Sequence, residues 1–150
     1  MEAVIDDYIE PAELTLHFAR YQEEVTTGKV GYNTAFDYGW CLIRSRKTDE
    51  VMKGIEMFKH LYKNGQQEAR RDCLFFTAVG YTKIREFELA LECIDTLLKA
   101  EPGNTQAKDL KHVIEDRLKK SGLIGMGLIA LGGATVVGAI GLVAMLTKKK

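Results

Sequence analysis

The sequence contains few of the residues and patterns that interrupt helices or build other folds. Only two prolines occur among its 150 residues, and no segment alternates polar and apolar side chains for long enough to predict a strand. Long stretches rich in Ala, Leu, Glu, Lys and Arg favour helices. Charged residues make up 28% of the chain, which is typical of a folded domain and not of a disordered one. We therefore expect an all-α domain.

Motifs for catalysis or cofactor binding are also lacking. The three histidines, His17, His60 and His112, are isolated, with no second histidine at ligand spacing, so neither a zinc site nor a cofactor is expected. The sequence has no G-x-S-x-G motif and no phosphate-binding loop. One match to G-x-G-x-x-A at 125–130 lacks the preceding strand and the following acidic residue of a dinucleotide site. An enzyme is not expected.

Basic residues do not cluster as nucleic-acid binding would require. The formal net charge is zero, but the last three residues, Lys148, Lys149 and Lys150, are all basic, so the remainder of the chain carries a net charge of −3. A weakly acidic domain argues against recognition of a phosphate backbone. We expect no nucleic-acid partner.

The cysteines and the N-terminus indicate a reducing compartment. Cys41, Cys73 and Cys93 lie inside apolar helical patterns and form no Cys-x-x-Cys pair, so each is predicted to be a small core residue. The first residues are acidic and contain no apolar run typical of a secretory leader. We expect the folded domain to face the cytosol.

The long apolar run lies at the C-terminal end. No charged residue occurs from Leu123 to Leu146, and a helix of this length would reach about 36 Å, enough to cross a bilayer. Lysines flank the run on both sides. These features predict a transmembrane tail anchor over 122–147, followed by a basic tail over 148–150. A buried core helix and a cleaved lipid-anchor signal are weaker alternatives. The predicted membrane-anchor residues include Leu123, Ile124, Gly125, Ala130, Ala134, Gly138, Leu142 and Leu146.

Small residues and glycines give this anchor two further expected properties. Ala130, Ala134 and Gly138 are spaced by four residues, and such a stripe lets a second helix approach closely. Self-association is one hypothesis, and simple tolerance of small residues is the other. The glycines make the anchor only moderately hydrophobic, which together with the basic flanks fits the mitochondrial outer membrane. The three terminal lysines are the predicted targeting residues.

The rest of the chain is predicted to be helical. Apolar residues recur at three- and four-residue spacing, Thr34 and Asp37 match a capping box, and Gly28, Gly31, Asn64-Gly65 and Pro102-Gly103 mark breaks. We expect a bundle over 11–121, preceded by an N-terminal arm over 1–10. The six predicted helices cover 11–26, 34–46, 50–63, 67–83, 87–100 and 104–120.

Within the bundle, two segments 36 residues apart resemble each other. Small residues recur at Gly54 and Ala90, and large ones at Phe58 and Ile94 and at Leu61 and Leu97. This spacing is typical of tetratricopeptide repeats. Two such helical hairpins need caps on their outer faces, which the first and last helices would supply.

The first helices of such hairpins line an inner surface that binds peptides or helices in many repeat proteins. The predicted register places several large apolar side chains there, where we expect contact with solvent. Two alternatives are that ordinary core packing or the N-terminal arm covers them, since the arm carries apolar Val4, Ile5, Tyr8 and Ile9. An arm lying in the groove would compete with a partner. The predicted groove residues are Phe36, Gly39, Ile43, Arg46, Asp72, Phe75, Val79 and Thr82.

Several stretches resemble the mitochondrial fission 1 protein family. They begin with MEAVI at the start, FDYGWCLIRS at 36–45 and MKGIEMF at 52–58. They continue with RRDCLFFTAVGY at 70–81, ALECIDTLLKAEPGNTQAKDL at 90–110 and GLIGM at 122–126. The chain departs from the family at Tyr81-Thr82 and in the turn at 45–48, which has no aromatic residue. Both departures border the predicted groove.

The resemblance implies a six-helix bundle with two tetratricopeptide-like hairpins and a tail anchor in the outer mitochondrial and peroxisomal membranes. It further implies an adaptor that receives a dynamin-related GTPase, or its adaptors, at sites of organelle fission. The alternative is a membrane-anchored scaffold for other trafficking, mitophagy or apoptosis regulators, with no direct role in fission.

Overall fold

The computed structural model describes residues 1–122, and these residues form seven helices with no strand among them. The short helix α1 (Glu2–Asp6) is followed by α2 (Pro11–Thr26), α3 (Tyr32–Ile43) and α4 (Thr48–Asn64). The second half contains α5 (Gln67–Lys83), α6 (Phe87–Ala100) and α7 (Thr105–Lys120). Short connections join them, so sequential helices pack side by side.

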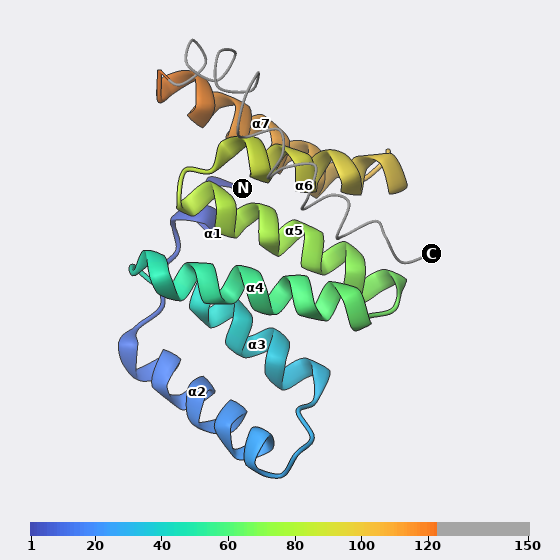
Figure 1. Ribbon diagram of the computed structural model, residues 1–150. Coiled ribbons are helices and arrows are strands. Elements are labelled where there is room, and N and C mark those ends of the chain that lie inside the picture. Colours follow the sequence, from blue (N-terminus) through green and yellow to red (C-terminus); the bar gives the residue numbers. More distant parts are fainter. Residues whose placement is uncertain (123–150) are drawn as a thin grey trace, which may run out of the picture.

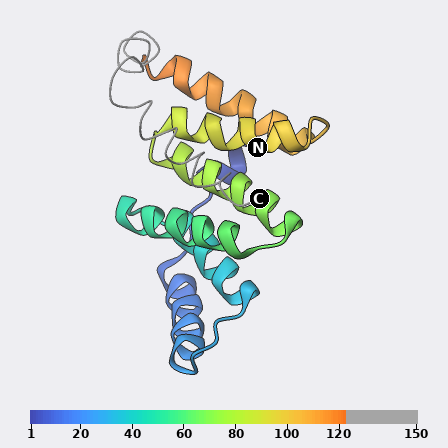
Figure 2. The same ribbon diagram turned by 45° about the vertical axis from the view of Figure 1, so that its right-hand side comes forward.

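The helices from α2 to α7 stack in chain order (Figure 1). The pairs α3–α4 and α5–α6 are the two predicted repeat hairpins, with α2 and α7 at the two ends. Helix α5 lies at the centre and also meets α3, α7 and the N-terminal helix α1. Figure 2 shows that α1 and the segment after it run along one side of this stack, away from the turn between α2 and α3.

All six predicted helices are present, and three of them have the predicted bounds. The seventh, α1, lies in the predicted N-terminal arm over 1–10, where no helix was predicted. The predicted capping box at Thr34 is wrong, because α3 begins two residues earlier, at Tyr32. Instead, the carboxylate of Glu24 in α2 accepts hydrogen bonds from the Gly31 amide at 2.8 Å and from the Thr34 hydroxyl at 2.6 Å.

The repeat pattern is confirmed in the core. The recurring positions that define the two hairpins are all buried, as are the three cysteines. A Cβ on Gly54 would lie 2.8 Å from Ile43 Cγ1 and 2.9 Å from the backbone oxygen of Gly39. Helices α3 and α4 therefore approach each other so closely that position 54 has no room for a side chain.

The predicted membrane anchor and the basic tail lie outside the described residues. Within residues 1–122, none of the helices combines the length and the apolar character needed to cross a bilayer.

The packing at Gly54 gives a test of the fold. We expect Gly54→Ala to lower the free energy of unfolding by up to about 2 kcal/mol, because overpacking costs about 1–3 kcal/mol and the higher helix propensity of alanine offsets about 1 kcal/mol. The measurement is urea unfolding of the fragment 1–121, which we expect to be soluble and folded. Gly103→Ala is the control, since its Cβ would meet nothing within 4 Å. Equal effects of the two substitutions would contradict the packing described here.

Candidate functional site: an apolar groove beside the N-terminal helix

An aromatic cluster lies where α3, α4 and α5 meet. The Phe76 ring is 4.7 Å from Trp40, 5.3 Å from Phe36 and 5.4 Å from Phe75, measured between ring centroids. The Phe58 ring of α4 packs against the Phe76 ring, with 5.6 Å between their centroids, and is fully buried. The four other rings are only partly buried, so they present an apolar surface to the outside.

This cluster forms the floor of a groove of about 520 Å³. Its wall includes Met1 and Val4, so the N-terminal helix borders the same groove as the aromatic rings. Polar groups at the rim include Arg71 and Asp72. The combination of apolar floor and mixed polar rim suits a peptide or a helix with an apolar face. The lining residues are Met1, Val4, Phe36, Trp40, Arg71, Asp72, Phe75, Phe76, Leu97, Asn104 and Gln106.

Three of the eight predicted groove residues line this groove: Phe36, Asp72 and Phe75. Arg46 is exposed, but its guanidinium carbon lies 4.2 Å from the centroid of the Tyr8 ring. Thr82 is buried, and its hydroxyl donates a hydrogen bond of 2.7 Å to the Ala78 carbonyl within α5.

The other three predicted residues, Gly39, Ile43 and Val79, are buried, so the expectation that the two large ones, Ile43 and Val79, meet solvent is wrong. Gly39 faces α4, where a Cβ would lie 3.4 Å from the Phe58 ring. The Ile43 side chain, 0% exposed, reaches toward both Gly54 and Gly80. Val79 is also 0% exposed and shares one core with Ile5 of α1, which lies against α5.

The prediction missed Trp40 and Phe76 because it followed a different stripe along the two helices. These residues are 36 apart, so they occupy the same position in the two repeats. That equivalence was the signal in the sequence that could have identified them.

The N-terminal arm is held by contacts at both ends. In α1, Ile5 is 1% exposed, and the carboxylates of Glu2 and Asp6 both form ion pairs with Arg117 of α7, the second at 2.8 Å. After α1, the Ile9 amide donates a hydrogen bond of 3.0 Å to the Arg44 carbonyl. The arm therefore connects α7, at one end of the stack, with the turn after α3.

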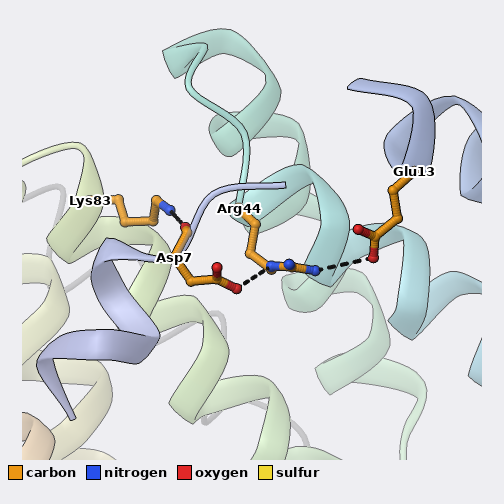
Figure 3. Close-up of polar contacts among 4 residues, drawn as sticks. All are labelled: Asp7, Glu13, Arg44 and Lys83. Carbon is orange, nitrogen blue, oxygen red and sulfur yellow. Dashed lines mark hydrogen bonds and ion pairs between the residues drawn. The ribbon is translucent and has the colours of Figure 1, made fainter. Parts of the chain in front are cut away.

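Figure 3 shows the polar contacts in the middle of the arm. Arg44 Nε lies 2.7 Å from Asp7 Oδ2, and Arg44 Nη1 lies 3.5 Å from Glu13 Oε1. Lys83 Nζ donates a hydrogen bond of 2.7 Å to the backbone oxygen of Asp7 and lies 4.4 Å from the centroid of the Tyr8 ring. Burial lowers the pKa of Lys83 to about 8, although the carboxylates of Asp7 and Asp6 partly offset this effect.

A second cavity, of about 560 Å³, lies between the turn after α2 and helices α3 and α4. It is bordered by Tyr21, Val30, Tyr32, Met57 and His60, among others. None of the predicted groove residues lines it. We take the groove beside α1 as the candidate site because it joins an exposed aromatic surface with a segment that can cover it.

Two family models match the chain. The Fis1 N-terminal tetratricopeptide repeat matches residues 33–65, and the Fis1 C-terminal tetratricopeptide repeat matches residues 71–123. These ranges cover most of the two hairpins described above.

Whole-length relatives and solved structures agree with these matches. The mitochondrial fission 1 protein of Homo sapiens is 40% identical over 145 residues, which is 95% of each chain. That of Yarrowia lipolytica is 39% identical over 121 residues, covering 81% of this chain and 77% of the relative.

Among solved structures, yeast Fis1 in complex with an Mdv1 fragment is 27% identical, with a TM-score of 0.72 over 79% of this chain and 92% of that one. Yeast Fis1 complexed with a Caf4 fragment is 25% identical, with a TM-score of 0.53 over 61% of this chain and 91% of that one. The family models, the relatives and the solved structures agree, and this chain belongs to the mitochondrial fission 1 protein family.

Proposed function

We propose that this chain is a tail-anchored adaptor that receives the mitochondrial fission machinery at the outer membrane. The family consists of tetratricopeptide-type adaptors, and the chain is not an enzyme. The observation that carries the proposal is the groove floored by Phe36, Trp40, Phe75 and Phe76 between the two repeats. It is supported by yeast Fis1, a relative of the same fold that has been solved with fragments of Mdv1 and Caf4.

The partner in this proposal is a dynamin-related GTPase or an adaptor of such a GTPase. It would place an apolar helix or extended segment on the aromatic floor, with polar groups near Arg71 and Asp72 at the rim. The anchor over 122–147 would insert into the lipid bilayer and hold the groove on the cytosolic side. Peroxisomal membranes are a second proposed location, on the ground of the family resemblance alone.

Phe75→Glu tests the groove. We expect partner binding to weaken by about 2 kcal/mol, roughly 30-fold, because a carboxylate would have to be desolvated against the aromatic floor. Phe75 is only partly buried, so the helical circular dichroism signal should not change. Proximity labelling from the intact anchored chain would identify the partners and their dependence on position 75.

Phe18→Glu provides the matched control, because Phe18 lies on α2 and is 43% exposed outside the groove. Loss of the same partners in both variants would argue against the groove. Labelling of trafficking or mitophagy regulators, with no component of the fission machinery, would support the alternative scaffold function. Val79→Glu, in contrast, is expected to unfold the domain, since that side chain is fully buried.

The N-terminal helix is proposed to compete with the partner. Ile5→Asp should detach α1, because it would place a carboxylate at a side chain that is 1% exposed. We expect stronger partner binding and labelling than in the wild type, since Met1 and Val4 would leave the groove wall. Ala3→Asp changes the charge equally at an exposed position of the same helix and should have little effect. Weaker binding by Ile5→Asp would mean that α1 is part of the binding surface.

The basic tail is proposed to direct the anchor. Replacing Lys148, Lys149 and Lys150 by serine should shift the chain from mitochondria toward the endoplasmic reticulum, because a moderately hydrophobic anchor would lose its cationic flank. Fluorescence microscopy of the tagged full-length chain measures the distribution. The control replaces Lys29, Lys63 and Lys108, three exposed lysines of the folded domain, by serine. An unchanged distribution of the tail variant would contradict the targeting role.

A further inference from the structure

Helix α2 is the least buried long helix among the described residues. None of its residues, Pro11–Thr26, is buried, and Leu16 is 70% exposed. Its main neighbour is α3, with which it forms an antiparallel hairpin (Figure 1). Burial of apolar area therefore contributes little to holding α2 in place, and a few specific contacts between the two helices have to do so.

These contacts follow one another along the hairpin. At the turn, Glu24 accepts hydrogen bonds from Gly31 and Thr34. In the middle, the Tyr38 ring lies 4.9 Å from the Tyr21 ring and 5.7 Å from the Phe18 ring. At the open end, where α2 begins and α3 finishes, the contact is a long one, 3.5 Å from Arg44 Nη1 to Glu13 Oε1.

Three side chains of types that can bind metal ions lie close together at that open end. Glu13 and His17 are one turn apart on α2, and Cys41 of α3 lies opposite them. The carboxylate oxygen, imidazole nitrogen and thiol sulfur all lie within 4.8 Å of one another. In a tetrahedral zinc site these atoms would be about 3.3–3.7 Å apart, as follows from the usual bond lengths. Rotation of the exposed Glu13 and half-buried His17 side chains can bring the three ligand atoms to these shorter distances.

We propose that Glu13, His17 and Cys41 bind one Zn²⁺ that links the open end of α2 to α3. Sulfur, nitrogen and carboxylate oxygen are the three ligand types that zinc accepts in proteins. On binding, the Cys41 thiol releases its proton to solvent and coordinates as the thiolate. A water molecule completes the tetrahedron, so the protein contributes three ligands.

The charges around the cluster are compatible with a divalent cation. Thiolate and Glu13 carboxylate together balance the charge of the ion, and the charged groups acting on the thiol are Glu13, Arg44 and Asp37. Arg44 holds Glu13 only weakly, at 3.5 Å, and would keep its closer ion pair with Asp7 at 2.7 Å. Burial raises the pKa of Cys41 to about 11, so zinc has to displace a firmly bound proton.

The site was not apparent in the sequence because its ligands come from distant positions. His17 has no second histidine at ligand spacing, and Cys41 follows it by 24 positions. Only the antiparallel arrangement of α2 and α3 brings the thiol to the helix turn that carries Glu13 and His17.

The test uses the metal-free full-length chain, purified in detergent. We expect it to bind one Zn²⁺ in titrations against a competing chelator. Co²⁺ in place of Zn²⁺ should give the near-ultraviolet charge-transfer band that marks a thiolate ligand. Amide hydrogen exchange should slow in residues 11–26 on addition of Zn²⁺, while α6 remains unchanged.

Four variants make the assignment specific. His17→Gln and Glu13→Gln, both on the accessible face of the cluster, should each weaken Zn²⁺ binding by at least about tenfold, and Cys41→Ser should abolish the Co²⁺ band. His112→Gln, an exposed histidine of α7, should change nothing. The proposal would be overturned by absence of stoichiometric binding, by equal affinity of His17→Gln and the wild type, or by binding that leaves exchange in α2 unchanged.

Discussion

The fold depends on the close packing of three helices around one side chain. Ile43, at the end of α3, contacts α4 and α5 at positions occupied by glycine. A Cβ on Gly54 of α4 would lie 2.8 Å from the Ile43 side chain, and a Cβ on Gly80 of α5 would lie 2.6 Å from it. Gly54 thus permits the close approach of the two helices within the first repeat, and Gly80 permits the close approach of the second repeat to the first. The aromatic cluster beside this point, and hence the groove, is positioned by the same approach of α3, α4 and α5.

The two N-terminal helices are attached to this core in different ways. Helix α1 is short, but Ile5 joins the core and Arg117 pairs with two of its carboxylates. Helix α2 is three times as long and has no buried residue. Length therefore says little about how firmly an element is held. The groove wall involves α1, and the cluster at Cys41 involves α2.

The helices and the two repeats could be predicted because they depend on local pattern. Apolar spacing located α5 and α6 to the residue, and the pairs Gly54/Ala90 and Phe58/Ile94 identified the hairpins. The groove was harder to predict. A large apolar residue on a helix looks the same in sequence whether it faces the core or a groove, so Ile43 and Val79 were placed at a surface from which packing removes them. Phe36, Asp72 and Phe75 do line the groove beside α1.

The sequence by itself determined the helical class, the repeat, the family and the long uncharged run at the C-terminus, since each is a property of residues near one another in the chain. Tertiary structure alone decided which face of α3 and α5 borders the groove, that the N-terminal segment folds as a helix beside it, and that Glu13, His17 and Cys41 meet. The physical reason is the same in each case. These features depend on contacts between segments far apart in the chain, and the approach of helices, set by small residues such as Gly54, fixes which side chains can touch.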